Sequence, residues 1–129
     1  MDQKTKKLFL IVVLCQACHS LEEFTGRLWE SFPPAEALCD LISDDHETGF
    51  LIINIGILLF GLAAYLFFLK KNNSLSNFII WFWVFIGFVN GIGHLVWSIL
   101  QKEYTPGLAT SQAVFLTTIL LLIKFRETD

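Results

Sequence analysis

Residues 50–69, FLIINIGILLFGLAAYLFFL, decide the fold class of this protein. The stretch carries no charged residue, and Asn54 is its only strongly polar side chain. A helix needs about 20 predominantly apolar residues to cross the hydrocarbon core of a bilayer. Because a chain inside lipid must satisfy its backbone hydrogen bonds within itself, such a run forms a helix. The stretch therefore predicts a transmembrane helix.

Three further apolar segments lie on either side of this stretch. We expect four transmembrane helices in all, at roughly residues 8–28, 49–70, 76–100 and 106–124. The first is the least apolar, because it contains several ionisable side chains: His19, Glu22, Glu23 and Arg27. The expected fold class is all-α, a four-transmembrane-helix bundle that forms one integral membrane domain over residues 1–129.

The composition of the whole chain agrees with this class. Of its 129 residues, 54% are hydrophobic and only 16% are charged, and the mean hydropathy is +0.60. An average soluble protein has about 25% charged residues. The net charge is -3 and no basic patch interleaves with aromatic residues, so nucleic acid is not an expected partner. The lipid bilayer is the expected environment.

The basic residues predict the orientation of the bundle. With four spans, seven of them fall on one side of the membrane: Lys4, Lys6, Lys7, Lys70, Lys71, Lys124 and Arg126. The other side has Arg27 and Lys102, so the positive-inside rule predicts that both termini are cytoplasmic. The connection between the first two spans is then extracytoplasmic, and it is acidic, with a short interfacial helix expected at residues 35–42. The start of the chain also resembles a signal peptide, but retention of the segment explains the charge balance better.

The polar residues within the spans fall at one depth. At about 1.5 Å of rise per residue, they lie roughly 16 to 27 Å from the cytoplasmic ends of their helices. They are His19, Glu22, Glu23, Asn54, Asn90, His94 and Thr110 to Gln112. Ionisable groups in a span usually face the bundle interior or a water-filled cavity. We therefore expect one polar site in the outer half of the membrane, open toward the outside.

The segment CQACHSLEE, residues 15–23, has two interpretations that exclude each other. CQACH matches the attachment signature of c-type haem, C-x-x-C-H. Haem c is nevertheless not expected, because attachment needs an aqueous compartment and both thiols here are predicted to lie near the middle of the bilayer. Cys15 and Cys18 are then expected to be small packing residues. The remaining interpretation is the motif H-x-x-E-E.

Two adjacent carboxylates within a span need neutralisation. Insertion scales put one acidic residue at a helix centre near +2.5 to +3.5 kcal/mol. A divalent cation held with His19 and His94 is one solution, and protonation of one carboxyl group is another. A third is an ion pair of Glu23 with Arg27, four residues later in the helix.

Three motifs resemble the signatures of one known family. His19 to Glu23 spell HSLEE, residues 90–94 spell NGIGH, and residues 104–107 spell YTPG. In this order they are similar to the HXXEE-domain family of small bacterial integral membrane proteins. The resemblance implies a multi-pass protein of the bacterial cytoplasmic (inner) membrane with a metal-dependent or acid–base site, and no established reaction. The family residues carried over are His19, Glu22, Glu23, Asn90 and His94.

The leading functional hypothesis is a membrane metalloenzyme. Imidazole and carboxylate ligands suit zinc or non-haem iron, and His19 and His94 with Glu22 or Glu23 supply such a set. The remaining glutamate would be a bridging ligand or a general base, and Asn90 would orient a ligand or the substrate. Other polar residues expected to line the site are Asn54, Gln112 and Arg27. The substrate would be an apolar or lipid-like small molecule.

Other interpretations remain open from sequence. A metal-free acid–base isomerase would use one glutamate as acid and the other, or His19, as base. A proton-coupled transporter would relay protons through the same residues, and a non-enzymatic membrane protein would use them for structure alone. A homodimer is also plausible, since Gly87, Gly91 and Gly93 would allow close helix approach.

Overall fold

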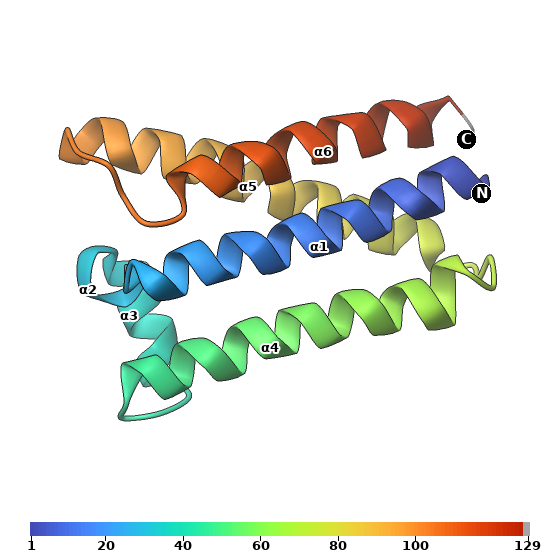
Figure 1. Ribbon diagram of the computed structural model, residues 1–129. Helices are drawn as coiled ribbons and strands as arrows, with labels where there is room; N and C mark the ends of the chain where they lie inside the picture. Colours follow the sequence, from blue (N-terminus) through green and yellow to red (C-terminus); the bar gives the residue numbers. More distant parts are fainter. Residues whose placement is uncertain (128–129) are drawn as a thin grey trace.

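The chain folds entirely into helices over the part that its structure, a computed structural model, describes, which is residues 1–127 (Figure 1). The long helices are α1 (Gln3–Thr25), α4 (His46–Ala64), α5 (Ser76–Gln101) and α6 (Leu108–Arg126). The π-helical turn η1 (Tyr65–Leu69) continues α4, and the short helices α2 (Leu28–Ser31) and α3 (Pro33–Asp40) connect α1 to α4. Together with η1, α4 spans 24 residues, and all four long helices are long and apolar enough to cross a membrane.

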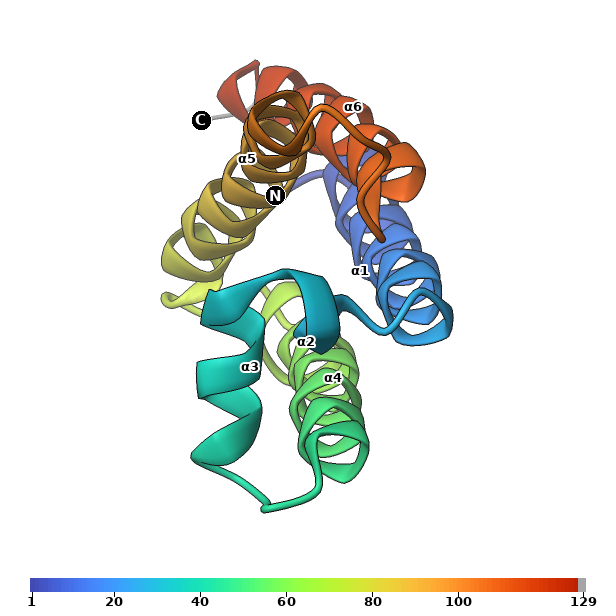
Figure 2. The ribbon, with the colours of Figure 1, turned by 90° about the vertical axis from the view of Figure 1, so that its left-hand side faces the viewer.

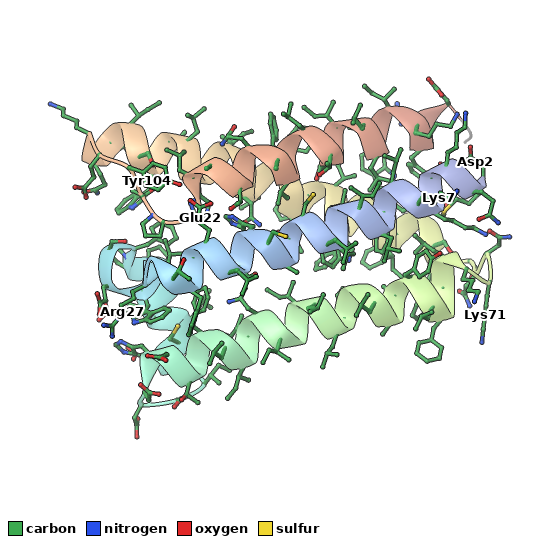
Figure 3. All side chains as sticks on the ribbon, in the orientation of Figure 1. Asp2, Lys7, Glu22, Arg27, Lys71 and Tyr104 are labelled. Atoms are coloured by element: carbon green, nitrogen blue, oxygen red, sulfur yellow. The ribbon has the colours of Figure 1, made fainter. Side chains whose placement is uncertain are left out.

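The two ends of the bundle differ in their residues. Both termini lie at one end, which we call the terminal end, and α2 and α3 lie at the other, which we call the distal end (Figure 1). Lys7 and Lys71 lie at the terminal end, whereas Arg27 lies at the distal end (Figure 3). The prediction that both termini are cytoplasmic depends on this separation of basic residues.

The four long helices do not form a closed square. α1 packs against both α4 and α6, and α5 packs against α6. Near the terminal end α5 also reaches α4, where the ring of Phe60 lies 5.7 Å from that of Phe82 and 6.5 Å from that of Trp83. Toward the distal end α4 and α5 diverge, and α2 and α3 lie across this end of the wedge between them (Figure 2). The wedge is the feature that positions the candidate site.

Apolar side chains fill both ends of the bundle interior. The larger cluster lies in the terminal half around Phe9, Trp83 and Leu121, and a smaller one at the distal end contains Leu28 and Trp29. Polar side chains of α1, α5 and α6 meet between the two clusters. Many large apolar side chains also point outward from the helices, as in a protein that lipid surrounds. The fold is that of a multi-pass membrane protein.

The helix ends differ from the sequence prediction by a few residues. α1 begins at Gln3, five residues before the predicted span, because Asp2 accepts a hydrogen bond from the backbone N–H of Thr5 and caps the helix. It ends at Thr25 because Arg27 turns the backbone into the left-handed region, at φ 52°. The expected interfacial helix begins two residues early, because Pro33 occupies its first turn, where a missing N–H costs nothing.

Candidate metal centre

Three side chains from two helices meet in the layer between the apolar clusters. His19 and Glu23 lie one turn apart on α1, and His94 reaches them from α5. Glu23 Oε1 lies 3.2 Å from His19 Nε2 and 3.1 Å from His94 Nε2. The two imidazole rings are perpendicular, with their centroids 4.7 Å apart. We call His19, Glu23 and His94 the triad.

The triad is shielded from the surroundings. His19 is fully buried, Glu23 is 8% exposed and the side chain of His94 is 11% exposed. Burial of a carboxylate is costly unless it is paired, and here both of its neighbours are imidazoles. The layer therefore concentrates one buried anion and two nitrogen ligands.

The second ring nitrogen of His19 has a defined partner on α6. His19 Nδ1 lies 3.0 Å from Thr110 Oγ1, and the Thr110 hydroxyl donates to Glu22 Oε2 over 2.5 Å. The backbone N–H of Thr110 donates to the same carboxylate oxygen over 2.9 Å. Because the threonine proton is engaged with Glu22, the hydroxyl oxygen accepts from His19, and the proton of His19 lies on Nδ1. Nε2 is then left with its lone pair directed into the triad.

His19 Nε2 is buried without a hydrogen-bond partner among the described residues. Its neighbour at 3.2 Å is the carboxylate oxygen of Glu23, which is also an acceptor. Two acceptors in this position repel each other unless a cation lies between them. The structure has no hydrogen bond between these two atoms, whereas a metal ion beside them would contact both.

The spacing of the donor atoms is close to that of a metal site. Zinc binds imidazole nitrogen and carboxylate oxygen at about 2.0–2.2 Å in tetrahedral geometry, so its ligand atoms lie roughly 3.3 Å apart. Two of the triad distances are 3.1 and 3.2 Å, and all three ligand atoms lie within 4.8 Å of one another. Two imidazoles and one carboxylate are also the ligand set of many non-haem iron sites.

The turn between α5 and α6 covers one side of the triad. Gly107, at φ 91°, lies so close that a Cβ atom there would come within 2.7 Å of Cε1 of both His19 and His94. The Tyr104 hydroxyl donates to the Glu22 carboxylate, and Thr105 Oγ1 lies 2.5 Å from Ser98 Oγ. The turn is therefore held at both ends while its glycine contacts the triad.

A cavity of about 340 Å³ lies on another side of the triad, with Glu23 and His94 in its wall. Residues of α3, α4 and α5 line it, so it lies in the wedge where α4 and α5 diverge. A smaller cavity of about 120 Å³ shares Asn90 and His94 with it and reaches Trp97. Among the described residues, none of 102–107 lines either cavity. Both cavities thus lie in the wedge, and the turn between α5 and α6 covers the triad on another side.

The other residues singled out from sequence lie around the triad or outside it. Asn90 donates to Gln16 Oε1 over 2.7 Å, and Asn54 accepts from the Ser20 hydroxyl over 2.6 Å. Gln112 donates to the backbone carbonyl of Gly91. Arg27 pairs with Glu30, Nε to Oε1 at 3.0 Å, where both side chains are exposed.

Sequence reasoning did not single out several residues that shape this centre: Thr110, Gly107, Tyr104 and Gln16. Thr110 stands in the polar group at the start of the last span, but nothing distinguishes it there from Ser111 and Gln112. Gly107 and Tyr104 belong to the YTPG motif, which the sequence identified as a family signature without assigning its residues to the site. These residues are visible in the sequence, but the side chains that they contact are known only from the fold.

The chain was compared with known proteins. One family model, described as a protein of unknown function with an HXXEE motif, matches residues 10–122 of the chain. No curated protein and no solved structure matches it. The matched region contains the triad, Glu22, Thr110 and the covering turn.

Proposed function

The chain belongs to the HXXEE family, and from this premise and the geometry of the triad we propose that it is a membrane-embedded metal-dependent enzyme acting on an apolar or lipid-like molecule. His19, Glu23 and His94 would hold the metal. The observation that carries the proposal is the buried Nε2 atom of His19, which lies 3.2 Å from a carboxylate oxygen and has no hydrogen-bond partner among the described residues.

The arrangement behind His19 supports this assignment. Histidine ligands of metals usually donate their other N–H to an acceptor, which sets the tautomer and the orientation of the ring. Thr110 accepts from His19 and is itself held by Glu22. We therefore assign Glu22 to positioning His19 through Thr110, and Glu23 to the metal. This distinguishes two glutamates that the sequence left equivalent.

The bound ion would be zinc or iron, and it would supply a Lewis acid for hydrolysis or a centre for oxygen chemistry. Glu23 and His94 line the wedge cavity, so a substrate there would reach the triad. Asn90 lies in the same wall and is placed to hold a polar group of the substrate. The turn and the distal apolar cluster would exclude bulk water.

The decisive experiment is metal analysis of protein purified in mild detergent without a histidine tag. Mass spectrometry of the metals should find close to one zinc or iron ion per chain. Glu23→Gln, His19→Ala and His94→Ala should each reduce occupancy to less than about a tenth of that of the wild type, because each removes a ligand.

Glu22→Gln is the matched comparison, since it makes the same chemical change one residue away. Loss of a group that orients a ligand typically weakens metal binding about 10- to 100-fold. Glu22→Gln should therefore still take up one ion when metal is in excess, whereas Glu23→Gln should not. Equal loss in both would contradict the separate roles. A wild-type protein that takes up neither ion after reconstitution would refute the metal centre and favour metal-free acid–base chemistry.

A further inference from the structure

The wedge cavity has apolar walls and a polar floor. α4 contributes Ile53 and Ile57 to the walls, and α5 contributes Phe85, Ile86 and Val89. The floor, on the side of α1, consists of Gln16 and Glu23 with Asn90 and His94 of α5 beside them. At about 340 Å³ the cavity is at the lower end of the roughly 300–1,000 Å³ usual for small-molecule sites. It has room for one apolar chain with one polar group.

The floor offers a hydrogen-bond donor and an acceptor beside the triad. Asn90 Nδ2 donates to Gln16 Oε1, and this bond orients both amides. Within the described residues, Gln16 Nε2 and Asn90 Oδ1 make no hydrogen bond of their own, and neither atom is fully enclosed by the protein. These two atoms are therefore available to a ligand in the cavity.

Asn54 also lines the cavity, but its amide is already engaged. Its Oδ1 accepts from the Ser20 hydroxyl, and its Nδ2 donates to the carbonyl of Phe50. The free hydrogen-bonding capacity of the floor is thus concentrated at Gln16 and Asn90, next to Glu23 and His94.

The charges around the cavity argue against an anionic ligand. No lysine or arginine lines either cavity in the described part of the chain. Glu23 lies in the wall, and Glu22 lies behind His19. Two carboxylates balance the charge of one divalent ion, so the site with its metal has no net positive charge to attract a phosphate or a carboxylate. A buried phosphate without a cationic partner would be costly.

From these observations we infer that the substrate is an uncharged amphiphile, a long-chain alcohol, ester or amide. Its polar group binds between the Gln16–Asn90 pair and the triad, and its chain lies between α4 and α5, where the wedge leads toward the surrounding lipid. This inference rests on the proposed function for the role of the triad, but the binding of the amphiphile is measurable separately.

The test uses a brominated long-chain alcohol and the phosphate monoester of the same alcohol, added to the full chain in detergent. Bromine quenches tryptophan fluorescence at short range, and Trp97 lines the smaller cavity. The binding signal is the difference in tryptophan quenching between the wild-type protein and the Trp97→Phe variant. We expect saturable quenching by the alcohol at a concentration at least about tenfold lower than by the phosphate.

Two variants test the polar floor and one tests the walls. Gln16→Ala and Asn90→Ala should each weaken binding of the alcohol about three- to tenfold, the value of one neutral hydrogen bond, and should reduce the preference over the phosphate. Val89→Phe should abolish the quenching, because the larger side chain fills the cavity without adding a second tryptophan signal. Gln101→Ala, at the exposed end of α5, is the matched control and should bind as wild type does.

Metal content measured on the same samples separates the two proposals. A chain that holds its metal but binds the phosphate as well as the alcohol overturns the inference and leaves the metal centre standing. Selective binding of the alcohol by a chain without metal supports the inference and refutes the proposed function. Quenching that Val89→Phe leaves unchanged would place the probe elsewhere and overturn the inference.

Discussion

Glu22 and Glu23 are adjacent and chemically identical, yet the fold gives them different partners. Glu23 contacts two histidines in the buried layer, whereas Glu22 binds Thr110 and Tyr104. Successive residues on a helix point about 100° apart, because one turn takes 3.6 residues. Both glutamates face the bundle, but one points toward α5 and the other toward α6. Their different partners follow from this rotation.

At the same scale, Gly107 determines how closely the turn approaches the triad. Gly107→Ala would bring a Cβ atom within 2.7 Å of both imidazole rings at a φ of 91°, which disfavours any residue with a Cβ. We expect metal affinity to fall at least about tenfold, measured by titration with a chelator of known affinity. Gly56→Ala is the control, since a Cβ there meets nothing within 4 Å. Unchanged affinity in Gly107→Ala would show that the turn does not constrain the ligands.

Tyr104 gives a pH-dependent prediction. Its hydroxyl donates to Glu22, and loss of its proton would bring two negative charges together, so the pKa of Tyr104 is raised above its ordinary value of 10.0. Because the pKa of Tyr104 is raised in the folded state, its hydrogen bond with Glu22 stabilises the turn fully below about pH 10. This stabilisation is lost as the pH rises through the raised pKa. In a Tyr65→Phe background, tyrosinate absorbance should therefore show a midpoint above 10.

Glu22→Gln removes the negative charge that raises this pKa. In that variant the midpoint of Tyr104 should fall back toward 10. The same midpoint in both proteins would mean that the phenol and the carboxylate are not in contact in solution.

At the scale of elements, α3 docks on α4 through a close backbone approach. A Cβ at Gly49 would lie 2.7 Å from the carbonyl oxygen of Cys39, and Cys39 itself is 1% exposed. Burial, together with the charge of Asp40, raises the pKa of the Cys39 thiol. Both effects make this thiol a poor nucleophile.

Gly49→Val should therefore separate α3 from α4 and make Cys39 reactive. With Cys15 and Cys18 replaced by serine, we expect slow maleimide labelling of Cys39 in the parent and labelling at least about tenfold faster in Gly49→Val, followed by mass spectrometry. Gly56→Val, which has open space around it, should label as slowly as the parent. Fast labelling of the parent would contradict the burial of the thiol.

Two glycines of α5 serve the packing of the chain itself. A Cβ at Gly87 would meet the side chain of Thr118, and a Cβ at Gly91 that of Phe115, both on α6. Nothing lies within 4 Å of a Cβ at Gly93. Two of the three glycines considered for contact with a second chain thus bring α5 and α6 together, and the homodimer stays a prediction.

At the scale of the whole molecule, the orientation in the membrane is open to a direct test. The terminal end carries most of the basic residues, and the positive-inside rule places it in the cytoplasm. In a cysteine-free background, Asp44→Cys lies at the distal end and Ser74→Cys in the loop between η1 and α5 at the terminal end. A membrane-impermeant maleimide should label only Asp44→Cys in intact cells, and both variants after lysis. The reverse pattern would refute the predicted orientation.

The four long apolar helices are predictable from the amino-acid sequence alone. Lipid solvates each helix separately, so whether a segment spans depends mainly on its own composition and length. The spacing of His19 and Glu23, one helical turn apart, likewise places them on one face without knowledge of any neighbour. Helix ends shifted by a few residues because caps such as Asp2 and the backbone turn at Arg27 act locally.

Which of these residues meet depends on how the helices pack against one another. The choice of Glu23 over Glu22, the role of Thr110 and the position of Gly107 depend on how α5 and α6 are rotated and spaced against α1. Close contacts such as that of Gly91 with Phe115 set that spacing. The wedge cavity depends on the divergence of α4 from α5, which no single segment encodes. Hydropathy along the chain predicts helices, whereas contacts between residues far apart in sequence form the site.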